Sequence, residues 1–142
     1  MIPTTIIQKM GQQAGNVDRD SADEGKVNEA LAAIGIEDHE QPKEFFTRFK
    51  LSGVLSNHPV ELLDLCSPTD QIFEATDFGR DTYEMTDDFV CLTSGEGEGF
   101  LVYSKQNRKI YDVSVSDLDA LEAGEKEASW DSFYDLVDWY LS

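Results

Sequence analysis

The last third of the chain carries three short apolar runs separated by two turn-like connections. The runs occupy residues 89–93, 99–103 and 109–113, and the connections occupy residues 94–99 and 104–108. Both connections have the length and the composition of β-hairpin turns. The pattern therefore predicts an antiparallel meander, and any fold for this chain has to cover the sheet that it forms.

An aromatic helix is predicted to follow the meander and to end the sequence. Ser129 is the expected N-cap, with Asp131 in the first turn, where the helix dipole favours an anion. Asp135 and Asp138 share a face with Asp131. Asp138 lies near the C-terminal end, where the dipole disfavours an anion, and such conflicts sometimes mark functional surfaces. Another face of this helix is apolar and carries Trp130, Phe133, Tyr134, Val137 and Leu141.

Two helices are predicted upstream. Ser21 and Glu24 have capping-box spacing, and Gly35 is a natural stop for the first helix. A second, short helix is expected to begin near Pro42, which suits the first helical position, and to stop by Ser52. The residues at core spacing in these helices are Val27, Ala30, Leu31, Ile34, Phe45, Phe46 and Phe49.

The remaining segments have weaker patterns. Residues 1–20 are poorly patterned and are interpreted as an extended or loosely docked lead-in to a domain that spans residues 21–142. Residues 60–66 form an apolar run that suits either a strand or a short helix. A chain of 142 residues is expected to fold as one domain with a sizeable core.

The charge balance is strongly acidic. Eleven basic and 29 acidic residues give a formal net charge of −18, concentrated between residues 51 and 99, where Arg80 is the only Lys or Arg. Such a charge argues against binding to nucleic acid or to an anionic membrane, and it favours a basic partner. A merely soluble surface, or that of a salt-adapted organism, would give the same balance.

The start of the chain resembles no signal peptide, and no run approaches the length of a membrane span. Cys66 and Cys91 have no metal-binding or disulfide-framework spacing, so two buried, reduced thiols are expected. These features predict a cytoplasmic protein.

The sequence contains no recognisable catalytic, cofactor or metal motif. The alternating glycines at 95, 97 and 99 do not have phosphate-loop spacing, and the acidic stretch from Asp18 lacks the turn glycine of a calcium loop. No nucleophile signature surrounds His39 or His58. We therefore expect no enzyme activity, no cofactor and no metal, although a carboxylate-based hydrolase remains a third-ranked alternative.

The order of these parts resembles the SUKH superfamily, the bacterial immunity proteins related to the yeast Smi/Knr cell-wall regulators. The resemblance spans residues 27–141. It is carried by Ala33-Ile34-Gly35, by Pro42-Lys43-Glu44-Phe45-Phe46, by the meander with Gly97-Glu98-Gly99-Phe100 and Lys109-Ile110-Tyr111-Asp112, and by Trp130-Asp131-Ser132-Phe133-Tyr134-Asp135-Leu136. This chain departs from the family's pattern at two points. Gln41-Pro42 stands in place of the family's leucine-proline pair, and Ser52-Gly53 stands in place of its asparagine-glycine stop.

This resemblance implies a single α+β domain with a mainly antiparallel sheet flanked by helices. It also implies a protein that binds and neutralises a secreted toxin, often a nuclease, without catalytic residues of its own. A regulatory or scaffold adaptor of the same fold is the alternative. A nuclease needs a basic surface to hold nucleic acid, which an acidic inhibitor could cover. The candidate partner-binding residues are Glu84, Asp87, Asp88, Glu96 and Glu98, and secondly Asp131, Asp135 and Asp138.

Overall fold

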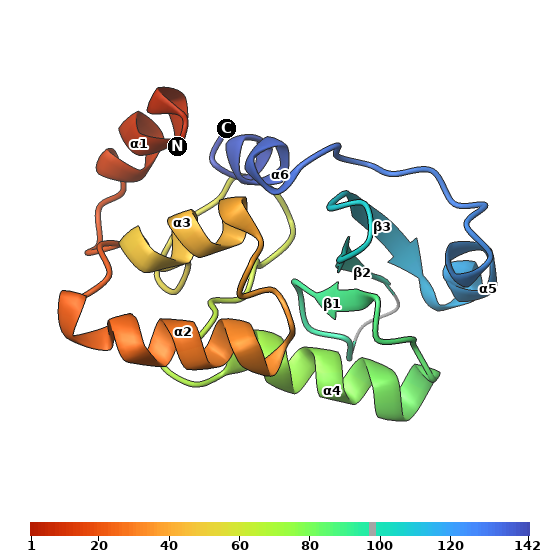
Figure 1. Cartoon of the computed structure of the whole chain (residues 1–142). Helices are drawn as coiled ribbons and strands as arrows, with labels where there is room; N and C mark the ends of the chain where they lie inside the picture. The colour runs from red at the N-terminus through yellow and green to blue at the C-terminus, as the bar shows by residue number, and fades with distance from the viewer. Residues whose placement is uncertain (97–98) are drawn as a thin grey trace.

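Six α-helices and a three-stranded sheet form within the part of the chain that the structure, a computed structural model, describes, which is residues 1–96 and 99–142 (Figure 1). The predicted α+β architecture is confirmed. The elements in chain order are α1 (Thr4–Gly11), the 3-10 turn η1 (Ser21–Asp23), α2 (Glu24–Ala33), α3 (Glu40–Arg48), α4 (Gln71–Tyr83), β1 (Phe89–Cys91), β2 (Gly99–Ser104), β3 (Ile110–Ser114), the 3-10 turn η2 (Val115–Asp117), α5 (Leu118–Glu122) and α6 (Phe133–Tyr140).

The sheet is the predicted antiparallel meander, in the order β1-β2-β3. Phe89 pairs with Ser104, and Val102 pairs with Tyr111. Successive side chains of a strand point to opposite faces, and here both faces are apolar. One face joins the main core, and the other joins a second cluster that includes Ala75 and Leu121. Helices therefore cover both faces of the sheet.

Both edge strands have their outward backbone N–H groups engaged. On β1, Cys91 N donates to Thr76 Oγ1 of α4 at 2.9 Å. On β3, Ile110 N donates to the Trp130 carbonyl at 2.9 Å, and Asp112 N donates to Ser129 Oγ at 3.3 Å. The last outward group, Ser114 N, donates to the Asp117 carboxylate at 3.0 Å.

The helices α2 and α3 confirm the predicted core, but both begin differently from the prediction. Asp20, not a Ser21–Glu24 capping box, caps this region, since its Oδ1 accepts from Ala22 N at 3.0 Å and η1 precedes α2. Helix α3 begins at Glu40, so Pro42 is its third residue rather than its first. All seven residues predicted for the core are buried, and Gly35 follows α2 with a φ of +76°, a left-handed conformation that suits glycine.

The N-terminal segment is not an extended lead-in. Residues 4–11 form α1, and Ile2, Ile6 and Met10 are buried in the main core. Their spacing of four residues gives α1 one apolar stripe. A helix of 8 residues is too short to be stable in isolation, so the stability of α1 comes from packing against the rest of the domain. Figure 1 shows α1 beside α6, with both termini at the same end of the molecule.

The last helix begins later than predicted. Trp130 pairs with Ile110 of β3 in an isolated bridge, and Ser129 N donates to the Ile110 carbonyl at 2.8 Å, so neither residue is helical. The N-cap is Ser132, whose Oγ accepts from Asp135 N at 3.1 Å, and not Ser129. Asp131 consequently precedes α6 and does not share a helix face with Asp135 and Asp138.

Helix α4 is the one long element that the sequence analysis does not predict. Its buried residues Ile72, Ala75, Thr76 and Gly79 recur at helical spacing, but two of them are small and one is polar, which weakens the apolar signal. Gly79 allows close packing, because a Cβ there would lie 3.0 Å from Met85 Sδ and 3.2 Å from Cys91 Sγ. The glycine that lowers helix propensity is thus the residue that brings α4 onto β1.

Candidate partner-binding surface

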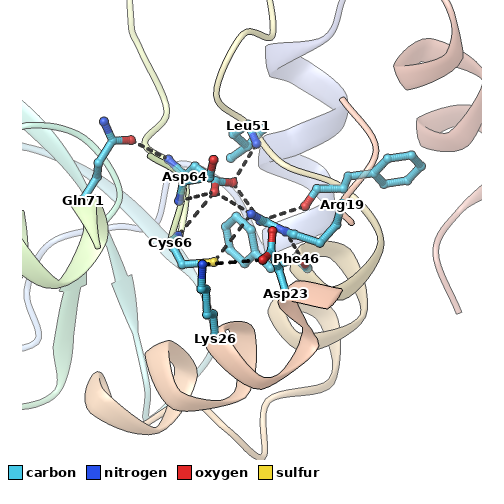
Figure 2. Close-up of polar contacts among 10 residues, drawn as sticks. Arg19, Asp23, Lys26, Phe46, Leu51, Asp64, Cys66 and Gln71 are labelled. Atoms are coloured by element: carbon cyan, nitrogen blue, oxygen red, sulfur yellow. Dashed lines mark hydrogen bonds and ion pairs between the residues drawn. The ribbon is translucent and has the colours of Figure 1, made fainter. Parts of the chain in front are cut away.

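One acidic residue of the middle segment is not on the surface at all. Asp64 is fully buried, and its two carboxylate oxygens accept from Arg19 Nη1 and Nη2 at 2.9 and 3.0 Å (Figure 2). The same carboxylate accepts from the backbone N–H groups of Leu51, Cys66 and Ser67. Arg19 in turn donates to the carbonyl groups of Phe46 and Phe49.

This arrangement satisfies a buried ion pair with additional hydrogen bonds, as such a pair requires. It also explains residues 60–66, which form neither the strand nor the helix expected of them. The backbone there bends around the Asp64 carboxylate, while Leu63 N donates to the Leu92 carbonyl beyond β1 at 2.9 Å. We assign Arg19 and Asp64 a structural role.

Among the candidate residues that the structure describes, the carboxylates of Asp88 and Asp138 accept hydrogen bonds from their own chain. The Asp88 carboxylate accepts from Ser104 Oγ and from Gln106 N, both at 2.8 Å, and thereby holds the β2–β3 turn. Asp138 forms an ion pair with Lys9 Nζ of α1 at 2.9 Å. The cation of Lys9 offsets the unfavourable helix-dipole position of Asp138. That local conflict is therefore resolved within the fold.

Asp131 and Asp135 lie near the start of α6. Asp131 is exposed and lies 3.8 Å from Lys109 Nζ, and Asp135 is exposed in the first turn, where the dipole favours it. Figure 1 shows α6 and α4 at opposite edges of the molecule. The second group of candidates therefore does not belong to the same surface as the first.

The other candidates surround α4. Glu84 is the exposed C-cap of α4, with a φ of 57°, and Asp87 is exposed and lies 3.6 Å from Arg80 Nε. Glu96 is exposed in the connection after β1. Glu98 lies outside the described residues. The structure thus gathers three of the first five candidates around one helix and its neighbouring turn.

Helix α4 adds acidic residues that the sequence analysis does not single out as candidates. Its exposed Glu74, Asp77 and Asp81 are spaced so that they share one helix face with Glu84. We call these four residues the acidic face of α4. Among the described residues, none of the four has a cation within ion-pair distance. The sequence signal for this face is the spacing of its carboxylates at intervals of 3, 4 and 3 residues. This spacing indicates a shared helix face only when residues 71–83 are known to be helical.

The acidic face is electrostatically unfavourable for the isolated helix. Like charges three or four residues apart destabilise a helix by about 0.2–0.5 kcal/mol per pair. Asp81 and Glu84 also lie at the C-terminal end, where the dipole disfavours anions. The charge on this face is therefore not explained by the stability of α4.

A hollow of about 290 Å³ lies beside the acidic face, between α4 and the connection that follows β1. Leu63, Ala75 and Phe78 are its apolar lining residues, and Glu74 and Glu96 are its acidic lining residues. The turn is fixed to the helix by a hydrogen bond of 2.9 Å from the Tyr83 hydroxyl to the Gly95 carbonyl.

The two thiols are not activated as nucleophiles. Burial raises the pKa of the Cys91 thiol to about 11, and burial also raises the pKa of the half-buried Cys66. A reactive thiol needs the opposite shift. Burial lowers the pKa of His39, whose Nδ1 lies 2.6 Å from the Tyr103 hydroxyl, and His58 stacks on Trp139 with ring centroids 3.8 Å apart.

Among the described residues, the pKa is lowered for the carboxyl groups of Glu44 and Asp117. A hydrogen bond from the N-terminal ammonium lowers the pKa of Glu44, with a second contribution from the Tyr134 hydroxyl. Hydrogen bonds from the backbone and hydroxyl of Ser114 lower the pKa of Asp117. A general acid requires a raised carboxyl pKa instead.

The described residues also contain no group of three or more His, Cys, Asp or Glu residues placed to hold a metal ion. None of the helices in the described part of the chain has the length and apolar character needed to cross a membrane. Comparisons with protein-family models, with curated proteins and with solved structures found no match to this chain.

Proposed function

We propose that this protein is an immunity protein of the SUKH type that binds a basic partner, a cognate toxin domain, through the acidic face of α4. The observation that carries the proposal is the row of exposed carboxylates on Glu74, Asp77, Asp81 and Glu84, none of which forms an ion pair with a described residue. Asp81 and Glu84 lie at the helix end where the dipole disfavours anions, so a role outside the domain accounts for them better than a role in folding.

The physical advantage of such a face is electrostatic. A chain with a net charge of −18 attracts a basic partner over long distances and accelerates the encounter. Carboxylates on a rigid helix then form charge-assisted hydrogen bonds with Arg and Lys of the partner. The α+β fold agrees with the architecture that the family resemblance implies.

The test is co-expression with the product of the neighbouring gene. We expect the protein to rescue cells from that product and to co-purify with it. The double variant Asp77→Lys/Asp81→Lys should lose rescue and slow association at least tenfold at low salt, because it reverses the charge at the centre of the face.

A matched control is Glu125→Lys/Glu127→Lys, which changes the net charge equally at two exposed residues remote in sequence from α4. It should retain rescue. Equal loss in both variants would show that only overall charge matters and would refute the assignment to α4. Co-purification with a cellular protein and no rescue would favour the regulatory adaptor instead.

A further inference from the structure

The hollow beside α4 has the chemistry of a site for a cationic side chain. Its volume of about 290 Å³ is at the lower limit for sites that take whole small molecules, so it suits a single inserted side chain. Leu63 and Phe78 are half-buried and offer apolar and aromatic surface, and Glu74 and Glu96 are exposed. A ligand there would meet apolar contacts and negative charge together.

The turn that forms one wall of the hollow is held against α4. Gly95 is buried, and a Cβ at this position would lie 3.1 Å from Phe78 Cδ1, so the backbone lies close against the ring. The hydrogen bond from Tyr83 to the Gly95 carbonyl fixes the same turn, and Tyr83 stacks on Phe100 of β2 with centroids 5.6 Å apart. The hollow is thus formed before any partner arrives, which reduces the entropic cost of binding.

Arginine fits this combination better than lysine does. Its planar guanidinium group stacks on aromatic rings, carries five donors that can serve two carboxylates, and is less strongly hydrated than an ammonium group. Arginine is also enriched among the residues that dominate protein interfaces.

We propose that the hollow formed by Leu63, Phe78, Glu74 and Glu96 binds one arginine side chain of the partner, with the guanidinium group on Phe78 and between the two carboxylates. This inference rests on the proposed function, because it names the anchor by which a basic partner would engage the acidic face of α4. It also makes a claim about the isolated protein, namely that the hollow selects a guanidinium group without any partner protein.

The experiment is an NMR titration of the full chain with Nα-acetyl-arginine amide. We expect saturable shifts of the backbone amides of Leu63, Ala75, Phe78 and Gly95, with a dissociation constant on the order of millimolar. Nα-acetyl-lysine amide should bind more weakly, and Nα-acetyl-norleucine amide should not bind.

Two variants test the assignment of the groups. Glu74→Gln/Glu96→Gln should weaken arginine binding about tenfold, because two charge-assisted hydrogen bonds are lost. Phe78→Leu should remove the preference for arginine over lysine while leaving the carboxylates in place. The matched control Glu125→Gln/Glu127→Gln, at exposed residues that do not line the hollow, should bind as the unmodified protein does.

Shifts spread evenly over the acidic surface, or equal weakening in the matched control, would show non-specific counterion binding and would overturn the inference. Absence of arginine binding together with intact toxin rescue would overturn it while leaving the proposed function standing. Arginine binding without rescue would support the hollow as a guanidinium site and refute the immunity function.

Discussion

Helices α4 and α6 carry their carboxylates in opposite ways. On α6, Asp135 occupies the favourable first turn and Asp138 is paired with Lys9 of α1. On α4, Glu74 also occupies the favourable first turn, but the acidic face forms no ion pair with any described residue and extends to the unfavourable C-terminal end. Both helices pack apolar residues into the domain, so the fold does not require the difference. It indicates that α6 joins parts of the chain, whereas α4 presents its charge outward.

Asp64 is the extreme case of a carboxylate that serves the fold. We expect Asp64→Asn to destabilise the protein by about 3–5 kcal/mol, because the buried Arg19 guanidinium loses its counter-charge. Urea denaturation followed by circular dichroism would measure the loss. The double variant Arg19→Met/Asp64→Leu should be less damaging than the single one. A loss below about 1 kcal/mol for Asp64→Asn would place this residue with the exposed carboxylates.

The N-terminal caps of α6 and α4 also differ, because only α6 has a side-chain cap hydrogen bond. Ser132→Ala should cost about 1 kcal/mol, because Ser132 Oγ accepts the Asp135 N–H at the start of α6. Asp70 at the start of α4 makes no side-chain cap hydrogen bond, so Asp70→Ala should cost only a few tenths of a kcal/mol. Thermal or urea unfolding of the two variants would compare them, and equal losses would contradict the distinction.

Removing one charge from each helix should change stability in opposite directions. Asp81→Asn relieves repulsion on α4 and should stabilise the protein by about 0.3–0.5 kcal/mol. Asp135→Asn removes a favourable dipole interaction from α6 and should destabilise it by about 0.3–1 kcal/mol. Parallel urea titrations at low salt would resolve both signs. A destabilising Asp81→Asn would mean that α4 uses this carboxylate within the fold.

The smallest expected effect is on stability at low pH, through the Glu44 carboxyl group. Because the pKa of Glu44 is lowered in the folded protein, its contribution to stability is present above the ordinary carboxyl pKa and is lost as the pH falls through the folded value. Tyr134→Phe removes the hydroxyl that donates to Glu44 Oε1 at 2.8 Å. We expect the pKa of Glu44 to rise in this variant, and side-chain NMR titration would measure it. An unchanged value would assign the shift to the N-terminal ammonium alone.

The sheet and the aromatic core could be predicted from the sequence because their signals are local. Three strands alternate with turns, and Phe45, Phe46 and Phe49 lie within five residues of one another. The boundaries of the helices were harder to predict from the sequence. Trp130 has helical spacing with the apolar face of α6, yet its bridge to Ile110, distant in sequence, keeps it out of the helix.

The candidate surface was predictable in charge but not in geometry. The excess of acid between residues 51 and 99 is visible in the sequence, whereas the buried location of Asp64 depends on Arg19, 45 residues away. Helix α4 escaped prediction because close packing of Gly79, rather than a strong apolar stripe, fixes it on the sheet. Both features are set by contacts between distant segments.

The engaged edges of the sheet restrict how this protein can recognise anything. With the outward N–H groups of Cys91, Ile110, Asp112 and Ser114 already bonded, an incoming chain cannot readily extend the sheet by adding a strand. Under the proposed function, the partner would then be recognised through side chains rather than by strand addition. Substitutions on the outer face of α4 would change that recognition without altering the backbone of the domain.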